Sequence, residues 1–308
     1  MVLMSNMRHI FIIVNPASGK YNQATLLRFV ERLQSAGLAV TVENTQYKGH
    51  ATALARNAVK AGIYSHIIAG GGDGTIAEVS NGLCGSACIL GILPIGTANV
   101  LAHELSIPVD ELQNAENIIS NVQVKIWPGE INKSGKSHIF LQMVGIGFDA
   151  YIVQNTSLSI KYFFGKLAYI ISTIAALFRY KFQKYDICID GEHYLATTAI
   201  ISKGKYYAGK YNIFQSSSQE IKEFSILLFQ VNSRMDFIKN IFQIFCPVSM
   251  FRSKCKFLFG SDISVQSIIP IPMQSDGDSV GFTPASIKIS NEFINVASGL
   301  HLMKNKEN

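Results

Sequence analysis

The chain has 308 residues, of which 48% are hydrophobic and 16% charged, a balance that excludes a disordered chain and provides enough apolar residues for about two domains. Lys and Arg number 27 against 21 Asp and Glu, and the net charge of +6 favours anionic partners: nucleotide phosphates, acidic lipid headgroups or nucleic acid. The five cysteines form no C-x-x-C motif, which argues against a zinc site and fits a reducing cytoplasm.

The first 125 residues alternate between predicted strands and helices. Apolar runs predict strands at residues 9–15, 38–43, 66–69 and 89–93, and apolar periodicity predicts helices at residues 22–36, 50–61, 75–84 and 97–105. Repeated β-α units predict an α/β domain with a Rossmann-like, doubly wound parallel sheet. The first strand lacks alternation, which fits a sheet covered by helices on both faces.

The pattern changes near Trp127 and Pro128. From there the chain reads mostly as strands with turn signals such as Asp190-Gly191, interrupted by predicted helices at residues 159–180 and 236–245. We therefore expect an α/β domain at residues 1–126 and a β-rich, sandwich-like domain at residues 127–291. We expect the C-terminal segment, from about 292 to 308, to pack back on the first domain.

No membrane span is predicted along the chain. The N-terminus lacks a basic segment followed by a long apolar core, so we predict no signal peptide. The longest apolar stretch, residues 167–178, has twelve residues, whereas a spanning helix needs about 20. The expected location is the cytoplasm.

The strongest chemical signal is the segment Gly70-Gly71-Gly72-Asp73-Gly74-Thr75, between a predicted strand and a predicted helix. Glycines let the backbone approach a ligand closely, and the N-terminus of the following helix offers free N–H groups to an anion. The segment predicts a phosphate cradle at the carboxyl end of a parallel strand. Asp73 adds a carboxylate that could hold Mg²⁺ or position an attacking group, or could simply cap the helix.

Three other strand ends carry polar or glycine residues. They are Asn15-Pro16-Ala17-Ser18-Gly19-Lys20, the segment from Thr45 to His50, and the segment LGILPIGTAN at residues 90–99. Each alone is typical of an ordinary loop or a helix cap, Thr97 being the expected cap of the fourth helix. Together with the glycine segment, they favour a shared nucleotide site.

These segments resemble the conserved blocks of the diacylglycerol kinase catalytic family, and most closely its bacterial YegS/DgkB-type lipid kinases. The matching blocks are NPASGK, GGGDGTIAEVSNGL and LGILPIGTANVLAHEL, followed by Gly145 to Ala150 and by a late Asp-Gly pair before Thr283-Pro284. NAD kinases share GGDGT, but the combination of blocks is typical of the lipid kinases. The resemblance covers nearly the whole chain.

The resemblance implies ATP at the first domain and a lipid hydroxyl acceptor in a cleft between the domains. Asn15 and Ser18 would line the phosphate side of the nucleotide. The other implied nucleotide contacts are Thr45, Gly71, Gly72, Asp73, Gly74, Thr75, Ile76, Ala77 and Thr97. Asp73 would also belong to the reaction centre, and Mg²⁺ would enter with the ATP.

The late motif departs from the family pattern. The family places its base at the Glu of a late Asp-Gly-Glu, whereas this chain reads Asp276-Gly277-Asp278. We predict that Asp278 is the catalytic base, one methylene shorter than the family residue. A misplacement of about 1 Å can cost on the order of a hundredfold in rate. Asp190-Gly191-Glu192 is a second candidate, but it reads as a hairpin turn.

The family's structural Mg²⁺ site also lacks its expected residues here. In the matching stretch, residues 215–226, Ile221-Lys222 replaces the family Asp-Gly, and isoleucine offers no oxygen ligand from its side chain. We therefore predict that the metal site near Ser218, Ile221 and Glu223 is absent or altered.

Two basic and aromatic segments have alternative interpretations. Residues 162–181 could dock on a membrane surface, from which a lipid kinase must draw its substrate, but a packed helix is the more common case. Residues 203–211 could form a nucleic-acid patch, which the family resemblance argues against. The sequence leaves the oligomeric state open, a homodimer included.

The leading hypothesis is therefore an ATP-dependent lipid kinase acting on a diacylglycerol-like, phosphatidylglycerol-like or sphingoid hydroxyl. The alternatives are an NAD kinase-like enzyme, because of the shared GGDGT, and a nucleotide- or lipid-binding regulator with weakened chemistry, because of the two departures. The sequence does not identify the lipid.

Overall fold

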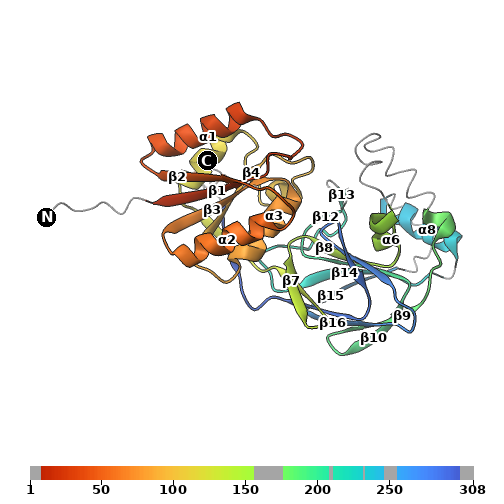
Figure 1. The fold of residues 1–308 in the computed structure, drawn as a ribbon. Helices are drawn as coiled ribbons and strands as arrows, with labels where there is room; N and C mark the ends of the chain where they lie inside the picture. The colour runs from red at the N-terminus through yellow and green to blue at the C-terminus, as the bar shows by residue number, and fades with distance from the viewer. Residues whose placement is uncertain (1–7, 156–175, 208–210, 232, 246–254, 299–308) are drawn as a thin grey trace.

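The computed structural model describes residues 8–155, 176–207, 211–231, 233–245 and 255–298. Figure 1 shows two domains side by side, with a helix-covered sheet in the first and stacked sheets in the second. The prediction of an α/β first domain with a parallel sheet and a β-rich second domain is confirmed.

The first domain is built on a six-stranded sheet in the order β2-β1-β3-β4-β20-β5. Its strands are β1 (His9–Val14), β2 (Ala39–Asn44), β3 (Tyr64–Gly71), β4 (Ile89–Pro94), β5 (Gln123–Ile126) and β20 (Ile294–Ala297). All neighbours pair in parallel except β5, which runs antiparallel to β20. The carboxyl ends of β1 to β4 therefore lie along one edge, as expected for repeated β-α units.

Helices cover both faces of this sheet. They are α1 (Gln23–Ser35), α2 (His50–Ala61), α3 (Asp73–Leu83), α4 (Val100–Glu104) and α5 (Glu111–Ile119). The apolar sides of α2, α3 and α4 pack on one face, in a cluster that includes Ile13 and Ile67. The apolar sides of α1 and α5 pack on the other face, in a cluster that includes Ile12 and Ile68. Side chains on both faces of each strand are thus buried, which explains the continuous apolar runs in the sequence.

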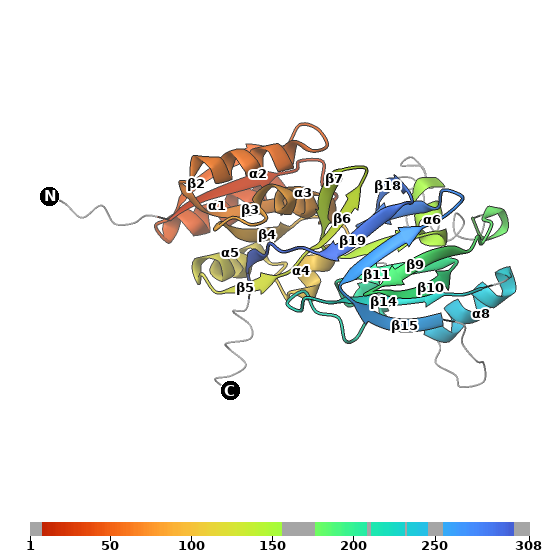
Figure 2. The ribbon, with the colours of Figure 1, turned by 90° about the horizontal axis from the view of Figure 1, so that it is seen from below.

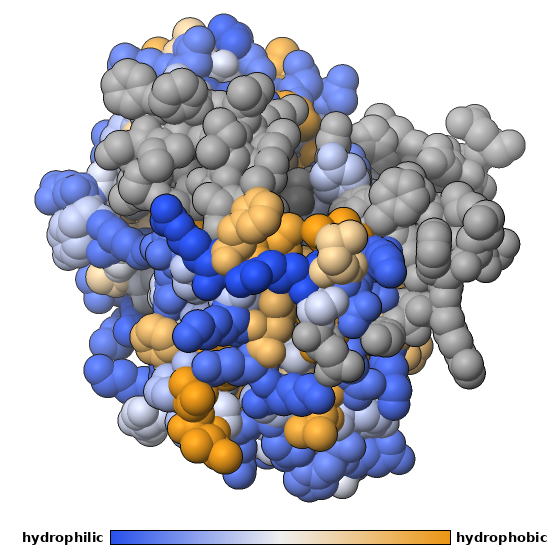
Figure 3. Space-filling model, turned by 90° about the vertical axis from the view of Figure 1, so that its right-hand side faces the viewer, coloured by the Kyte–Doolittle hydropathy of each residue, from blue (hydrophilic) through white to orange (hydrophobic). Residues whose placement is uncertain are grey.

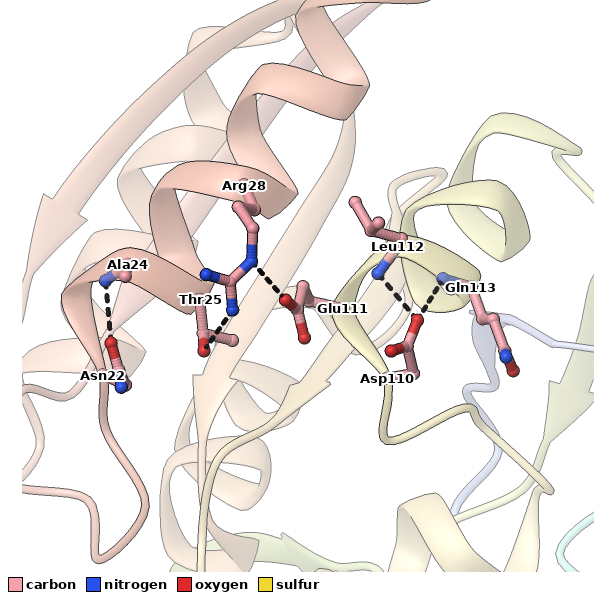
Figure 4. A network of polar contacts seen from close by, with 8 residues as sticks. All are labelled: Asn22, Ala24, Thr25, Arg28, Asp110, Glu111, Leu112 and Gln113. Carbon is pink, nitrogen blue, oxygen red and sulfur yellow. Dashed lines mark hydrogen bonds and ion pairs between the residues drawn. The ribbon is translucent and has the colours of Figure 1, made fainter.

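Capping residues fix where α1 and α5 begin (Figure 4). The Asn22 side chain accepts a hydrogen bond from the Ala24 N–H at 2.8 Å, and the Asp110 carboxylate accepts from the N–H groups of Leu112 and Gln113 at 3.1 and 2.9 Å. Arg28 of α1 pairs with Glu111 of α5 at 2.6 Å. Helix α5 was not predicted, although Asp110 is a recognisable N-cap residue.

Helix α4 begins later than predicted. Thr97 was the expected cap, but the cap residue is Asn99, which has a left-handed backbone with φ of 51°. The Asn99 side chain accepts from the Gly96 N–H at 2.9 Å and donates to the Pro94 carbonyl at 3.1 Å. These bonds fold residues 94–99 into a separate tight loop, so the helix can start only at Val100.

The second domain stacks two antiparallel six-stranded sheets. One has the order β10-β9-β16-β19-β6-β7 and the other β15-β14-β11-β8-β17-β18. The strands of the first are β6 (Gly129–Lys133), β7 (Lys136–Phe140), β9 (Tyr185–Ile189), β10 (Glu192–Ala196), β16 (Asp262–Gln266) and β19 (Ala285–Ile289). Those of the second are β8 (Met143–Ile146), β11 (Thr198–Ser202), β14 (Phe224–Phe229), β15 (Cys255–Gly260), β17 (Pro272–Ser275) and β18 (Asp278–Phe282). Buried side chains from both sheets form one core, as in a β-sandwich.

Smaller elements complete this domain. They are a short ribbon of β12 (Tyr206–Tyr207) and β13 (Tyr211–Asn212), and the helices α6 (Phe148–Asn155) and α8 (Arg234–Phe245). Helix α8 corresponds to the helix predicted at residues 236–245. Residues 159–175 of the helix predicted at 159–180 lie outside the described residues.

The last described strand, β20, belongs to the first sheet although it follows the second domain in the chain. It lies between β4 and β5. In Figure 2, the blue strand near the C-terminal trace lies beside β5. The chain thus crosses between the domains twice, once after β5 and once before β20.

Candidate active site

A pocket of about 790 Å³ lies between the two domains. Its first-domain wall consists of the loops after β1 and β2, the first turn of α2 and one side of α3. Its second-domain wall consists of β7 and the β17–β18 hairpin. Residues that line it include Asn15, Thr45, Gly74, Thr75, Ala77, Asp276 and Asp278.

The pocket brings together some of the predicted site residues but not all. Asn15, Thr45, Gly74, Thr75, Ala77 and Asp278 line it, whereas Ser18, Gly71, Gly72, Asp73, Ile76 and Thr97 lie outside its lining. The residues outside the lining belong to the loop after β1, to the junction of β3 and α3, and to the loop after β4, and several hold these segments in place.

Glycines at the ends of β3 and β4 allow the segments of this site to approach closely. A Cβ added at Gly71 would lie 2.4 Å from the Thr75 side chain, and one added at Gly96 would lie 2.2 Å from the Gly72 Cα. Any side chain at Gly96 would therefore push the loop after β4 away from the loop after β3. Similarly, a Cβ at Gly19 would lie 2.9 Å from the Thr97 hydroxyl oxygen, so the loops after β1 and β4 are neighbours.

The loop after β1 is tied directly to α3. The Asn15 amide donates to the Thr75 hydroxyl at 3.2 Å, and the Asn15 side-chain oxygen accepts from the Ala17 N–H at 3.0 Å. The Ser18 N–H donates to the Asn15 carbonyl at 3.1 Å. Asn15 thus shapes its own loop and fixes that loop against the first turn of α3.

Ile76 does not fit the predicted role in nucleotide contact. Its side chain is fully buried in the core beneath α3, and its N–H donates to the Gly72 carbonyl at 3.0 Å. The apolar stripe of α3 explains this position: Ile76, Val79 and Leu83 follow helical spacing. Ile76 anchors the helix rather than presenting a group to the pocket.

Asp73 links two helices. Its carboxylate accepts a hydrogen bond from the Val100 N–H at 2.7 Å, so this first residue of α3 caps α4. Burial raises the pKa of Asp73, and hydrogen bonds from the backbone of Val100, Leu101 and Asn99 oppose that rise. The capping alternative considered for Asp73 therefore applies, but to the neighbouring helix.

Asp276 belongs to the late Asp-Gly pair, but the sequence assigned no role to it, and the structure shows it half-buried in the pocket lining. Its carboxylate accepts from the N–H groups of Leu141, Gln142 and Met143 at 2.7 to 2.9 Å. Burial raises the pKa of Asp276 to about 6, and the charge of Asp73 adds to the rise while the three N–H groups oppose it. Only its place in an Asp-Gly turn could have signalled it.

Asp278 lies at the mouth of the pocket with its side chain 64% exposed. Its carboxylate pairs with the Lys48 ammonium at 2.9 Å. Lys48 comes from the loop after β2, so this ion pair joins the two domains. The Gln274 side chain supports the turn by accepting from the Gly277 N–H at 2.9 Å.

Glu78 is a further residue that sequence reasoning missed. From α3 it accepts hydrogen bonds from the N–H groups of Gly49 and Ala51 at 2.8 and 3.2 Å. Glu78 therefore accepts hydrogen bonds from N–H groups at the start of α2 that have no partner within the helix, since the cap residue Gly49 has no side chain. This contact holds the loop that carries Thr45 and Lys48 against the glycine segment.

Glu192, the second candidate base, lies outside the pocket lining. It follows the hairpin turn between β9 and β10, and its carboxylate accepts from the Tyr194 hydroxyl at 2.5 Å. Glu192 and Tyr194 both lie in β10, an edge strand of the second domain.

The segment of the predicted altered metal site contains no side-chain ligand cluster. Ile221 and Glu223 are exposed, and the carbonyls of Ser218, Ile221 and Glu223 all accept from the Lys203 ammonium. Among the described residues, no group of three or more His, Cys, Asp or Glu could hold a metal ion. Lys203 is itself fully buried, which excludes it from any surface patch.

Comparisons with known proteins agree with this architecture. Residues 9–131 match the family described as diacylglycerol kinase catalytic domain, and residues 142–298 match the family described as YegS C-terminal NAD kinase beta sandwich-like domain. The fold is similar to the crystal structure of a diacylglycerol kinase from Bacillus anthracis str. Sterne. The TM-score is 0.73 and the identity 19%, over 96% of this chain and 99% of that one.

Relatives in sequence carry related names. The diacylglycerol kinase of Bacillus subtilis (strain 168) is 25% identical over 307 residues, which cover 98% of each chain. The diacylglycerol kinase of Staphylococcus carnosus (strain TM300) is 32% identical over 169 residues, 54% of each chain. A Pseudomonas putida protein named "Probable lipid kinase YegS-like" is 34% identical over 145 residues, 46% of this chain and 47% of that one. The chain therefore belongs to the family of diacylglycerol kinases and YegS-like lipid kinases.

Proposed function

We propose that this protein is an ATP-dependent lipid kinase that transfers the γ-phosphoryl group of ATP to a lipid hydroxyl. The observation that supports this most is that one pocket is lined by strand-end loops of the first domain and by the Asp276–Asp278 turn of the second. Phosphoryl transfer depends mainly on positioning and charge stabilisation, and it needs a phosphate cradle and an acceptor-orienting carboxylate in the same space.

The start of α3 supports the nucleotide side of the proposal. Gly74 and Thr75 line the pocket in the first turn of this 11-residue helix. The first N–H groups of a helix have no acceptor within it, and the positive end of its dipole favours anions. A Cβ added at Gly74 would meet nothing within 4 Å, so the backbone is open on that side. The phosphates of ATP would bind there.

The carboxylates available for Mg²⁺ suit an ion that arrives with the nucleotide. Asp73 and Asp276 lie near enough for the charge of Asp73 to raise the pKa of Asp276. Protein Mg²⁺ sites of this class use one or two carboxylates and take their other ligands from phosphates and water. When bound, the ion would neutralise phosphate charge.

Asp278 would orient the acceptor hydroxyl and withdraw its proton. Its carboxylate is exposed at the mouth of the pocket, where a hydroxyl could approach it. The Lys48 ammonium would leave Asp278 for the anionic phosphates as the nucleotide binds, which would free the carboxylate for the acceptor. The acceptor class is a diacylglycerol-like, phosphatidylglycerol-like or sphingoid lipid.

Contact with the inner face of a membrane would supply this substrate. At the far end of the second domain, Phe178, Met235 and Ile238 are 68%, 60% and 42% exposed, and Arg234 binds the Phe178 carbonyl. Figure 3 shows the second domain end-on, with scattered apolar groups among hydrophilic ones. Within the described ranges, no helix is long and apolar enough to span a bilayer. Transient surface docking fits these features.

The test is transfer of label from γ-labelled ATP to a panel of diacylglycerol, phosphatidylglycerol and sphingosine in mixed micelles. We expect one lipid to be labelled, and Asp278→Asn to lower kcat by roughly a hundredfold or more, as for loss of a general base. Asp262→Asn is the matched control, because Asp262 is also exposed and paired with a lysine, Lys288, at 2.9 Å. A complete lack of labelled lipid, or full activity in Asp278→Asn, would refute the proposal.

An NAD kinase-like activity is the second candidate, because the matched C-terminal family carries NAD kinase in its description. Incubation with NAD and ATP distinguishes the two activities: formation of NADP would show that NAD, and not a lipid, is the phosphoryl acceptor. If neither acceptor is phosphorylated while calorimetry detects ATP binding, the protein is a nucleotide-binding regulator instead.

A further inference from the structure

Lys203 is a buried cation that the proposed reaction does not use. It follows β11 directly, and its side chain is among the largest that are fully buried. Its ammonium donates to the Ser218 and Glu223 carbonyls, each at 3.3 Å, and to the Ile221 carbonyl. All three carbonyls belong to the loop before β14, which we call the 215–223 loop.

The number of bonds matches the chemistry of the group. An ammonium has three donors and no acceptor, and each of these donors has a carbonyl partner. Buried lysines are rare unless they are paired, since an unpaired buried charge is costly. Conversely, three backbone carbonyls that point at one spot need a cation, because their negative ends repel one another. The Lys203 ammonium therefore provides the positive charge that the three carbonyls need, and the carbonyls provide its hydrogen-bond acceptors.

A divalent metal ion does not fit this loop. Hard cations take oxygen ligands, and carboxylates usually supply part of the set. Here the carbonyl oxygens already face the Lys203 ammonium, while Ile221 has no side-chain oxygen and Glu223 is exposed. We infer that the Lys203 ammonium is a built-in cation that closes the 215–223 loop in place of a structural metal ion and thereby positions the turn that carries Asp278.

Two hydrogen bonds connect Lys203 and the 215–223 loop to the backbone that binds Asp276 in the pocket. Gln219, in the middle of the loop, is buried and donates from its side chain to the Leu141 carbonyl at 2.7 Å. The Lys203 N–H donates to the Gln142 carbonyl at 2.8 Å. The N–H groups of the same two residues hold the Asp276 carboxylate. The peptides that bind Asp276 are thus fixed on their other side by the lysine and its loop.

A carboxylate of the first domain provides the opposite charge. Glu104, at the end of α4, accepts from the Lys205 N–H at 3.0 Å and from the Gln219 side chain at 3.5 Å. A Cβ added at Gly204 would lie 2.3 Å from the Glu104 carboxylate, so the Glu104 side chain packs directly against the residue that follows Lys203. Burial lowers the pKa of Lys203 to about 8, and the charges of Glu104 and Glu223 oppose that change. The ammonium form therefore persists at pH 7.

The role assigned to Lys203 rests in part on the proposed kinase activity, so the experiment has two independent arms. The first uses no substrate. Calorimetry of the nucleotide-free wild-type protein with Mg²⁺ should detect no bound ion at millimolar concentration. Lys203→Ala should lower Tm by at least about 6 °C, since removing one partner of a buried charged network is among the costlier substitutions. Propylammonium should restore roughly half of that loss in Lys203→Ala and nothing in wild type.

The second arm uses the lipid kinase assay. Lys203→Met, which keeps the length of the side chain but not its charge, should lower kcat at least about tenfold while KM for ATP stays within about threefold, because misplacement of a reacting group acts on the chemical step. Lys205→Met is the matched control two residues along the chain and should keep wild-type kinetics. If the wild type labels no lipid, the proposed function fails, while the first arm still decides the role of Lys203.

Three results would overturn the inference. They are stoichiometric Mg²⁺ bound to the nucleotide-free wild type and lost in a variant of the 215–223 loop, a Lys203→Ala variant with unchanged Tm, and equal rescue of the wild type and the variant by propylammonium. If Lys203→Ala does not fold, the metal titration of the wild type and the kinetics of Lys203→Met remain decisive.

Discussion

The Asp276 carboxyl group lines the pocket and accepts hydrogen bonds from three backbone N–H groups, which hold the turn in which Asp278 begins β18. Three N–H groups bind it, and the backbone of Asp276 is left-handed, with φ of 47°. The following Gly277 also has positive φ, as a tight hairpin turn requires. Asp276 thus positions Asp278 through its hydrogen bonds to the backbone.

Substitution of Asp276 tests this division of roles. In Asp276→Asn, one side-chain oxygen becomes a donor and faces N–H groups, which should destabilise the fold by about 2 kcal/mol and lower kcat by tenfold or more. Asp190→Asn is the matched control: Asp190 has the same backbone, with φ of 47°, and also accepts N–H groups, from Ser261 and Asp262. Because that turn lies outside the pocket lining, its kcat should not change. Urea unfolding and initial rates measure both effects; equal kcat in the two variants would contradict the argument.

At the scale of elements, β20 shows how a short C-terminal strand completes the first domain. It pairs with β4 on one side and β5 on the other. Ile294 and Val296 face the core cluster beneath α2 and α3. The Asn117 side chain of α5 also donates to the Ala297 carbonyl at 2.9 Å. Without β20, both β4 and β5 would lose a neighbour.

We therefore expect a substitution in β20 to destabilise the first domain. Val296→Ala removes two methyl groups from a fully buried position and should cost about 1 to 3 kcal/mol. Asn295→Ala is the control on the same strand, since Asn295 is only half-buried and points to the other face. Hydrogen exchange should show faster opening of β4 and β5 amides in Val296→Ala. Exchange that accelerates only in the second domain would disprove the assignment.

The predicted elements show what local sequence can determine. The helices with a clear apolar stripe, such as α1 and α2, were predicted within one residue or two, because their periodicity depends only on neighbours. The start of α4 was wrong, because Asn99 adopts a left-handed conformation to bind Gly96 and Pro94, which no pattern signals. Asp190-Gly191 is a turn, as expected, and Asp276-Gly277 is a turn with the same backbone conformation, so only the fold distinguishes the one beside the pocket.

At the scale of the whole molecule, the site depends on contacts between the domains. The Asn81 side chain of α3 binds the backbone of Ile139 of β7 in both directions, at 3.1 and 3.3 Å. Lys48 and Asp278 pair across the mouth of the pocket, and Glu104 reaches the loop around Lys205. Motifs predicted which loops share the sheet edge. They could not predict the partners of Asp276, which lie 133 to 135 residues away in the chain. Nor could they predict the partners of Lys203, which are backbone carbonyls of an irregular loop 15 to 20 residues further along.

Two buried titratable groups, one in each domain, should make stability depend on pH in opposite directions. His66 of β3 is fully buried, and burial, with a smaller effect of Arg8, lowers its pKa to about 4. The unfolded chain binds this proton near pH 6.5, so the contribution of His66 is lost as pH falls from about 6.5 toward 4. Asp276 has its pKa raised to about 6 from 3.8, so the folded state keeps a proton that the unfolded state releases, and stability falls as pH rises from about 4 to 6.

Urea unfolding between pH 4 and 7 should therefore show a shallow net dependence that the two single variants separate. His66→Gln removes the loss at low pH, so stability should then fall steadily as pH rises from 4 to 6. Asp276→Asn removes the opposite contribution, so stability should then rise from pH 4 to 6.5. Each contribution is at most about 3.5 kcal/mol, since one unit of pKa shift is worth about 1.4 kcal/mol. Parallel curves for the two variants would show that these groups do not titrate as their burial requires.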